Sequence, residues 1–252
     1  QSPLGVRMHT AGYQALGIDA TYTAFSSDNL LKTIKAVEAL GFSGLSVSMP
    51  YKQDVVELLD EYSEDVEAIG ACNTIVFESD KLIGHNTDWF GAVEAIREAV
   101  DINSLKTALI VGAGGTARAI AYGLKKSTNL EITVAARNLQ SADDLRDSFD
   151  LYESASLKDL PDKNFDLIVN ATPDARLSGP VTESMLHGSQ ALLDVVITPP
   201  VTPLAELARQ NNLAVAPGWR MLLHQGVRQF KIYTGEDAPI DVMSSVLFEH
   251  IA

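Results

Sequence analysis

Two different spacings of hydrophobic residues run along the chain. In the N-terminal part, apolar residues at helical spacing predict helices over residues 9–16 and 29–40. Alternating apolar and β-branched residues predict strands over residues 20–25 and 44–49, and Pro50 stops the second strand.

A hairpin is predicted further along this part. Residues 71–78 form a strand-like segment that turns at residues 79–80 into a second one over 81–84. Residues 52–59 are typical of a helix, and another helix runs from 88 to about 100. This N-terminal part is therefore an α/β unit without a phosphate-binding loop.

From residue 107 onward, strands and helices alternate. The apolar run 107–111 predicts a buried strand, and an amphipathic helix follows over 116–126. Alternation at this spacing predicts an α/β fold with a parallel sheet covered on both faces. Further strands are expected over 131–136, 166–170 and 191–196, and further helices over 141–149, 203–211, 222–234 and 240–250.

The turn after residue 111 carries a dinucleotide-binding fingerprint. Its residues are Gly112, Ala113, Gly114, Gly115, Thr116 and Ala117. The first glycine permits a tight turn, the second lets the backbone approach a pyrophosphate, and the small alanine at the end lets helix and strand pack closely. The helix N-terminus would add N–H donors. The alternative is a glycine-rich turn that only joins two elements, but the strand before it and the helix after it favour nucleotide binding.

The end of the next strand distinguishes NAD from NADP. An acidic residue there would bind the ribose 2′-hydroxyl of NAD, whereas a cation would accept the 2′-phosphate of NADP. Arg137 and Asn138 follow this strand, so the sequence favours NADP. The alternative is a solvated Arg137 with NAD accepted, and Asp143 and Asp144 in the next helix would weaken a phosphate preference.

Three polar clusters stand beside strand-like segments. One runs from Ser48 to Lys52, the second is Asn73-Thr74, and the third is Asn86-Thr87-Asp88. Ammonium, amide, hydroxyl and carboxylate groups can all pair with ring hydroxyls, so the clusters favour a polyol substrate. Each one alone also fits a turn or a helix cap.

Taken together, these residues resemble the shikimate/quinate dehydrogenase family. The resemblance implies an α/β substrate-binding domain (1–87 plus 223–252) and an inserted Rossmann NADP-binding domain with a parallel sheet (88–222). The matching blocks span nearly the whole chain in family order and are Ser48-Met-Pro-Tyr-Lys52, Ala68-Ile-Gly-Ala-Cys-Asn73-Thr74, Asn86-Thr87-Asp88, the Gly112 loop, Asn170-Ala171-Thr172-Pro173 and Gly218-Trp-Arg-Met221-Leu-Leu-His-Gln225-Gly226.

The resemblance implies an oxidoreductase of aromatic amino acid biosynthesis that reversibly reduces 3-dehydroshikimate to shikimate with NADPH. Lys52 and Asp88 match the family's catalytic pair. The other matched site residues are Ser48, Asn73 and Gln225 for the ring hydroxyls, and the Gly112 loop, Arg137, Asn138, Thr172, Gly218 and Met221 for the cofactor, with Met221 as an apolar shelf near the nicotinamide.

The sequence departs from the family pattern in three places. The family's Ser-x-Ser-Pro block, which grips the substrate carboxylate, is matched only by Ser2, so either the natural chain begins earlier or it belongs to the divergent shikimate dehydrogenase-like branch. Ile197 stands where the family often has a tyrosine hydroxyl, which weakens the assignment of the substrate. Arg176 is interpreted as a surface loop residue, with a second phosphate contact as the alternative.

Other functions follow from the same residues. A quinate or aminoshikimate dehydrogenase would need the same Lys52 and Asp88, and the sequence does not separate these substrates. A cofactor-binding regulator with faded activity is a second alternative, against which the intact pair argues. A folate-linked dehydrogenase is disfavoured by the Asn86-Thr87-Asp88 block and the segment from Met221 to Gln225.

Composition narrows the partners. The formal net charge is -14 and no concentrated Lys/Arg run is present, which argues against nucleic acid and anionic membranes as partners. The family resemblance implies a small ring carboxylic acid as the partner. The single Cys72 favours a reducing compartment, so we expect a cytoplasmic protein. The sequence leaves the oligomeric state open between a monomer and a homodimer. His9, His85 and His224 lack ligand spacing, and no metal site is predicted.

Overall fold

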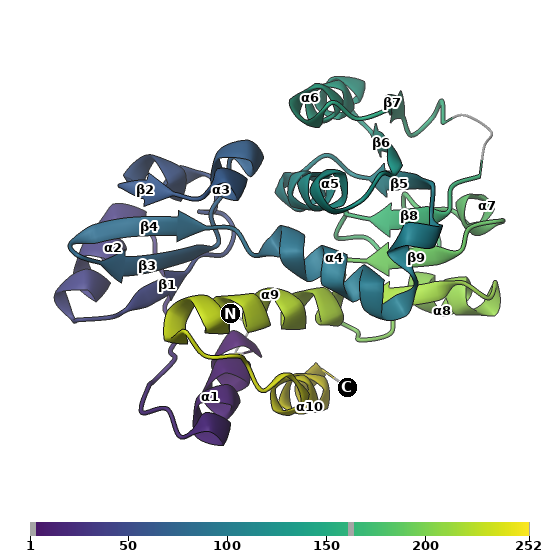
Figure 1. The fold of residues 1–252 in the computed structure, drawn as a ribbon. Coiled ribbons are helices and arrows are strands. Elements are labelled where there is room, and N and C mark those ends of the chain that lie inside the picture. The colour runs from purple at the N-terminus through teal and green to yellow at the C-terminus, as the bar shows by residue number, and fades with distance from the viewer. Residues whose placement is uncertain (1–3, 161–163, 252) are drawn as a thin grey trace. The chain divides into compact units, whose positions relative to one another are not determined.

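The computed structural model describes residues 4–160 and 164–251, so Ser2 lies outside the described residues. The chain divides into two compact units. Unit 1 contains residues up to Thr87 together with Gln225–His250, and unit 2 contains Asp88–His224 and Ile251. Each unit has its own sheet (Figure 1).

Unit 1 is an α/β unit around a four-stranded sheet of order β1-β3-β4-β2. The strands β1, β3 and β4 pair antiparallel, whereas β2 pairs parallel to β4. Its elements are α1 (Leu4–Leu16), α2 (Leu30–Ala39), β1 (Gly44–Ser46), the 3-10 helix η1 (Asp54–Leu58), β2 (Glu61–Tyr62), α3 (Glu64–Ile69), β3 (Thr74–Glu78), β4 (Lys81–His85), the second part of α9 (Gly218–Thr234) and α10 (Ile240–Ile251).

The predicted hairpin is confirmed. Strands β3 and β4 pair from Thr74 opposite His85 to Glu78 opposite Lys81. The two turn residues between them, Ser79 and Asp80, have φ angles of 51° and 61°. A two-residue turn with both φ angles positive matches the twist of the flanking strands, which fixes their register.

Two predictions in unit 1 are wrong. Residues 20–25 form no strand, because β1 pairs with β3 and the described residues offer them no strand partner. Side chains hold this segment instead: the Tyr22 hydroxyl donates to Ser46 Oγ over 2.6 Å. The helix expected over 52–59 is the shorter 3-10 helix η1, which follows a cis Met49–Pro50 bond.

Unit 2 is built on a six-stranded sheet of order β10-β9-β8-β5-β6-β7, in which every pair is parallel. This is the strand order of a Rossmann fold. Its elements are α4 (Asp88–Ala99), the 3-10 helix η2 (Ile102–Ser104), β5 (Thr107–Val111), α5 (Gly115–Ser127), β6 (Glu131–Ala136), α6 (Leu139–Phe149), β7 (Glu153–Ser156), β8 (Leu167–Asn170), α7 (Glu183–Leu186), β9 (Ala191–Asp194), α8 (Pro203–Gln210), β10 (Ala214–Pro217) and the first part of α9.

Helices cover both faces of this sheet, with α4 and α5 on one side and α7 and α8 on the other (Figure 1). The strand β5 shows why its sequence is continuously apolar. Ile110 packs into the core on one face, whereas Leu109 and Val111 pack into the core on the other. Full burial of such a side chain contributes about 1.5–3 kcal/mol. No helix among the described residues is long and apolar enough to span a bilayer.

His9 lies in an aromatic cluster inside unit 1. Its ring stacks on Tyr22 at a centroid distance of 4.4 Å and lies 6.1 Å from Phe230. The imidazole is fully buried, and neither ring nitrogen has a hydrogen-bond partner among the described residues. Burial lowers the pKa of His9 to about 4.

We expect this histidine to make unit 1 acid-sensitive. In the unfolded chain His9 takes up a proton near its ordinary pKa of 6.5, whereas in the folded chain it does so only near pH 4. The free energy of unfolding therefore decreases as the pH is lowered from about 6.5 to about 4. The total loss is about 3 kcal/mol. His9→Phe keeps an aromatic ring at this position but cannot take up a proton. Its free energy of unfolding, measured by chemical denaturation, should depend less on pH than that of the unmodified chain. The exposed His250→Gln is the control, and an unchanged slope in His9→Phe would contradict the assignment.

Candidate nucleotide and substrate sites

The glycine loop follows β5, a central strand of the parallel sheet. Gly112 follows β5 with a φ of +116°, a conformation that side-chain-bearing residues rarely adopt. A Cβ here would lie 3.1 Å from the carbonyl oxygen of Ala171, which follows the neighbouring strand β8. The Gly112 N–H donates to the Ala135 carbonyl of β6 over 2.8 Å. The loop therefore lies where the connections from β5 and β8 diverge, which is where open α/β sheets bind ligands.

The N-terminus of α5 is open to solvent. Gly114 caps the helix and Gly115 is its first residue. Both glycines are exposed, and no atom lies within 4 Å of a Cβ built on either. Thr116 is half-buried and Ala117 is fully buried in the core. The loop thus leaves room for a diphosphate above backbone N–H groups that the helix does not use.

Arg137 and Asn138 follow β6 on the surface. No other group of the described residues makes a hydrogen bond or ion pair with the Arg137 guanidinium. Asn138 caps α6, because its Oδ1 accepts from the backbone N–H of Gln140 over 3.0 Å. This strand end therefore presents a guanidinium that can bind a phosphate.

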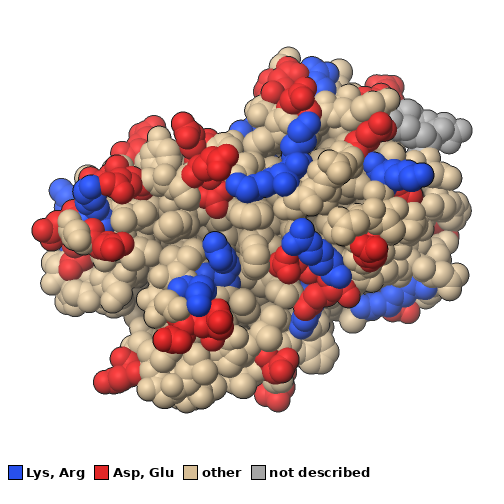
Figure 2. All heavy atoms as spheres, in the orientation of Figure 1, with Lys and Arg blue, Asp and Glu red and all other residues tan. Residues whose placement is uncertain are grey.

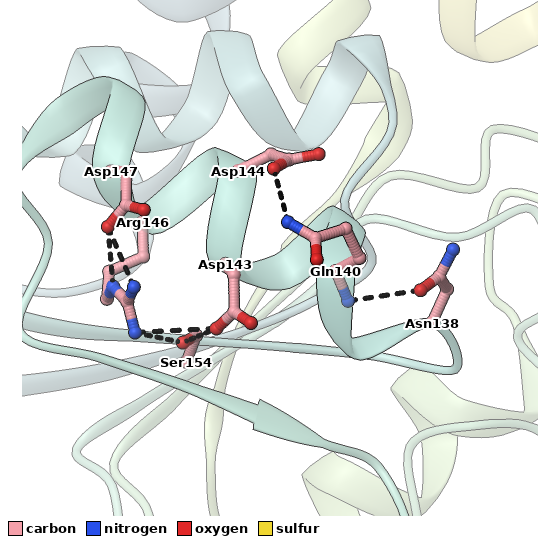
Figure 3. A network of polar contacts seen from close by, with 7 residues as sticks. All are labelled: Asn138, Gln140, Asp143, Asp144, Arg146, Asp147 and Ser154. Atoms are coloured by element: carbon pink, nitrogen blue, oxygen red, sulfur yellow. Dashed lines mark hydrogen bonds and ion pairs between the residues drawn. The ribbon is translucent and has the colours of Figure 1, made fainter.

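The acidic residues of α6 are already engaged (Figure 3). Asp143 accepts from Ser154 of β7 over 2.5 Å and lies 3.4 Å from Arg146. Asp144 accepts from the Gln140 amide over 2.9 Å. The charge of Asp143 is thus balanced inside α6 and β7, which reduces its effect on a phosphate at the strand end.

A buried polar network supports the loops after β8 and β9. Asn170 donates to Asp194 over 3.0 Å, and Asp194 accepts from Thr202 over 2.5 Å. The Thr172 hydroxyl donates to the side-chain Oδ1 of Asn170 over 2.7 Å, which fixes the loop that faces Gly112. Burial raises the pKa of Asp194. Sequence reasoning missed this network, although Thr202 before a proline is a recognisable helix cap.

The start of α9 lies against the loop after β9. A Cβ at Gly218 would lie 2.5 Å from the Val195 carbonyl oxygen and 2.6 Å from that of Val196, so the approach requires glycine. Met221 is 8% exposed and belongs to the core cluster against which Ala113 and Val195 pack. It is therefore mainly a core residue of unit 2.

Asn73 organises the polar site of unit 1. The side chain is 2% exposed and donates to the Thr87 hydroxyl over 2.9 Å. Its Oδ1 accepts from the Thr87 N–H and the Thr74 hydroxyl. Gln225 of α9 contacts the same Thr87 hydroxyl over 3.4 Å. Gln229, which sequence reasoning missed, donates to Thr74 over 2.9 Å.

The two expected catalytic residues adjoin this network along the chain. Lys52 is half-buried, and its carbonyl accepts from Cys72, the residue before Asn73, over 2.8 Å. Asp88, also half-buried, is the first residue of α4 and directly follows Thr87. Ser48 is exposed in the turn before Lys52. The catalytic and substrate-binding roles of these residues stay predictions.

Most charged groups on the surface are paired or interspersed with opposite charges. Figure 2 shows basic side chains lying close to acidic ones on one face of the molecule. Arg176 donates twice to Asp174, at 2.8 and 2.7 Å, which supports the interpretation as a surface loop residue. Within the described ranges, no group of three His, Cys, Asp or Glu side chains could hold a metal ion.

Family models match most of the chain. The shikimate dehydrogenase substrate binding domain matches residues 1–75, the shikimate / quinate 5-dehydrogenase model matches 94–201, and the shikimate 5'-dehydrogenase C-terminal domain matches 218–248. A shikimate dehydrogenase (NADP(+)) of Haloarcula marismortui is 41% identical over 250 residues, which cover 97% of this chain and 93% of the relative. The chain belongs to the shikimate/quinate dehydrogenase family. The resemblance drawn from its motifs is therefore confirmed.

Solved structures of the family share the whole fold. A shikimate dehydrogenase in complex with NADP+ is 32% identical, with a TM-score of 0.91 over 99% of this chain and 91% of that one. A quinate dehydrogenase from Corynebacterium glutamicum in complex with NAD is 30% identical, with a TM-score of 0.89 over 99% and 96%. The predicted fold class, an α/β substrate-binding domain with a Rossmann domain, is confirmed.

The two glycines of the loop should respond differently to alanine. We expect Gly114→Ala to lower NADPH affinity at least about tenfold, because its Cβ occupies the space of the diphosphate. Its melting temperature should change little, since no protein atom lies nearby. Gly112→Ala should lose both affinity and stability. Fluorescence titration and thermal melts measure these effects, with Gly5→Ala in α1 as the control. Full NADPH affinity in Gly114→Ala would contradict the loop assignment.

Proposed function

We propose that this chain is an NADP-dependent dehydrogenase that reversibly reduces 3-dehydroshikimate to shikimate. The observation that carries the proposal is the match to shikimate dehydrogenases across both units, with relatives named as NADP(+) enzymes. The open start of α5 and the available guanidinium of Arg137 support NADP as the cofactor.

The residues of the Rossmann unit fit the proposed cofactor. Gly114 and Gly115 leave space for the diphosphate, and Arg137 offers a forked donor for the 2′-phosphate. Thr172 and Gly218 shape the loops at the same edge of the sheet. NADPH, when bound, supplies a hydride to the substrate carbonyl. The acidic net charge makes these local donors necessary, because the overall field repels an anionic cofactor.

Lys52 supplies the proton in the proposed reaction. A carbonyl carbon that gains a hydride leaves a negative charge on its oxygen, and the Lys52 ammonium donates a proton to that oxygen to form the alcohol. In the reverse direction, neutral Lys52 accepts the hydroxyl proton. Asp88, the second member of the proposed catalytic pair, orients the Lys52 ammonium in this proposal. Ser48, Asn73 and Gln225 would bind the ring hydroxyls, and Ser2 the carboxylate.

Quinate is the second candidate substrate. Ile197 stands at a position where the family resemblance leads us to expect tyrosine, and a quinate dehydrogenase shares the fold at a TM-score of 0.89. Oxidation of quinate would use the same Lys52 and Asp88. We also infer a cytoplasmic enzyme, because a single cysteine, Cys72, favours a reducing compartment. We expect the enzyme to be monomeric or homodimeric.

A single assay tests the proposal. NADPH oxidation by the purified protein is measured with 3-dehydroshikimate and with 3-dehydroquinate, each also with NADH. Turnover with 3-dehydroshikimate and NADPH supports the main proposal, and preference for 3-dehydroquinate supports the alternative. Absence of turnover with every pair would exclude a dehydrogenase of either kind and favour a cofactor-binding regulator.

We expect Lys52→Ala to lower kcat by about two to four orders of magnitude, because the alkoxide loses its proton donor. NADPH affinity should survive, since Lys52 is not among the residues that the proposal assigns to the cofactor. Stopped-flow turnover and fluorescence titration separate the two effects. The exposed Lys35→Ala should behave as the unmodified chain does. Wild-type kcat in Lys52→Ala would exclude the proposed role.

Arg137→Ala tests the choice of cofactor. Loss of the Arg137 guanidinium should raise the KM for NADP+ by about 10- to 100-fold, because a charge-assisted hydrogen bond to phosphate contributes about 1.5–3 kcal/mol. The KM for NAD+ should stay the same, which reverses or abolishes the preference. Arg209→Ala on the exposed side of α8 is the control. An unchanged ratio of kcat/KM for the two cofactors would show that another group reads the phosphate.

A further inference from the structure

Helix α5 contacts the start of α4 at a point remote from the nucleotide loop. Gly123 lies eight residues after Gly115, about 12 Å along the helix. A Cβ at Gly123 would lie 2.9 Å from the carbonyl oxygen of Trp89 and 3.1 Å from Val93 Cγ2. Distances below 3 Å to a backbone oxygen leave no room for a methyl group. Only glycine therefore lets α5 approach the first turn of α4 this closely.

The side chain of Trp89 is held on the same surface of α5. Its ring meets Tyr122 edge-on, with centroids 5.8 Å apart and an interplanar angle of 83°. Lys126 places its Nζ 5.6 Å from the Trp89 ring centroid and 5.1 Å from that of Tyr122. The same Nζ donates to the Tyr122 hydroxyl over 2.8 Å. Backbone and ring of Trp89 are thus both fixed by one helix.

Trp89 directly follows Asp88, the first residue of α4. The peptide plane that carries the Trp89 carbonyl and the plane that joins Asp88 to Trp89 meet at the Trp89 Cα, so a displacement of this carbonyl moves the first turn of α4, which includes Asp88. At its other end, α5 begins in the glycine loop. We propose that Gly123 and Trp89 are positioning residues: through them α5 fixes the Asp88 carboxylate relative to the nucleotide loop. This inference rests on the proposed function, in which Asp88 orients Lys52.

A contact that only stabilises the fold would have different consequences. Its loss would lower the melting temperature and leave the kinetics of the folded enzyme unchanged. A positioning contact lowers kcat without changing cofactor affinity, because only the geometry of the reacting groups is altered.

The experiment uses Gly123→Ala in the full chain. We expect kcat for shikimate oxidation by NADP+ to fall about tenfold, since the added methyl shifts the first turn of α4. The KM for NADP+ should stay within about twofold of the unmodified value. Gly12→Ala is the matched control, because its Cβ would clash with the Phe230 side chain, 2.7 Å away, in α9 within unit 1.

A second pair of variants covers the case in which Gly123→Ala does not fold. Trp89→Ala removes the ring from Tyr122 and Lys126 and should show the same loss of kcat, whereas Trp89→Phe keeps an aromatic ring and should restore most of it. Unchanged kcat in folded Gly123→Ala or Trp89→Ala, or a fall in kcat that comes with an equal loss of NADP+ affinity, would overturn the inference. Inactivity of the unmodified chain, or full activity of Asp88→Asn, would instead overturn the proposed function.

Discussion

The close approach of the Gly112 turn to the Ala171 carbonyl is the constraint on which unit 2 depends. The connections that follow the parallel strands β5 and β8 lead to opposite faces of the sheet there, and only a residue without a side chain, at a φ of +116°, fits between their loops. Because the turn is this tight, α5 begins immediately after it, with its first N–H groups facing solvent. The bonds of Asn170 and Thr172 then hold the opposite wall of the same crevice.

In unit 1, the side chain of Asn73 holds two chain segments together. The segment before β3 and the segment after β4 must stay together where the ladder ends, and Asn73 bonds to both Thr74 and Thr87. Each bond contributes only about 1 kcal/mol, but an unpaired buried amide would cost about 1–3 kcal/mol. The network therefore specifies one arrangement of these chain ends rather than adding much stability. It also fixes where the chain passes into α4 and Asp88.

Elements with their own local signal were predictable from the sequence, and edge strands were not. The apolar run of β5, the Asn29 cap of α2 and the turn at Ser79 each carry their information in a few neighbouring residues. The short edge strands β2, β7 and β10 each pair with a single neighbouring strand, so their position depends on that neighbour rather than on their own sequence. Residues 20–25 show the reverse, since an alternating pattern without a partner forms no strand. The loop residues of the site followed from motifs, whereas Asp194 and Gln229 depend on contacts distant in sequence.

The charge distribution explains how an acidic protein can suit an anionic cofactor. Arg146, Arg176 and Arg220 each form an ion pair with a carboxylate of the protein, which compensates their positive charge. Arg137 has no such partner among the described residues, and the nearby Asp143 is balanced by Arg146 and Ser154. The field at the end of β6 is therefore set by one arginine rather than by the net charge of -14. Within α6, Arg146 pairs with Asp143 and Asp147 while Asp144 accepts from the Gln140 amide, so each of these carboxylates is engaged inside the helix and the proposed phosphate site at Arg137 is compatible with an acidic α6.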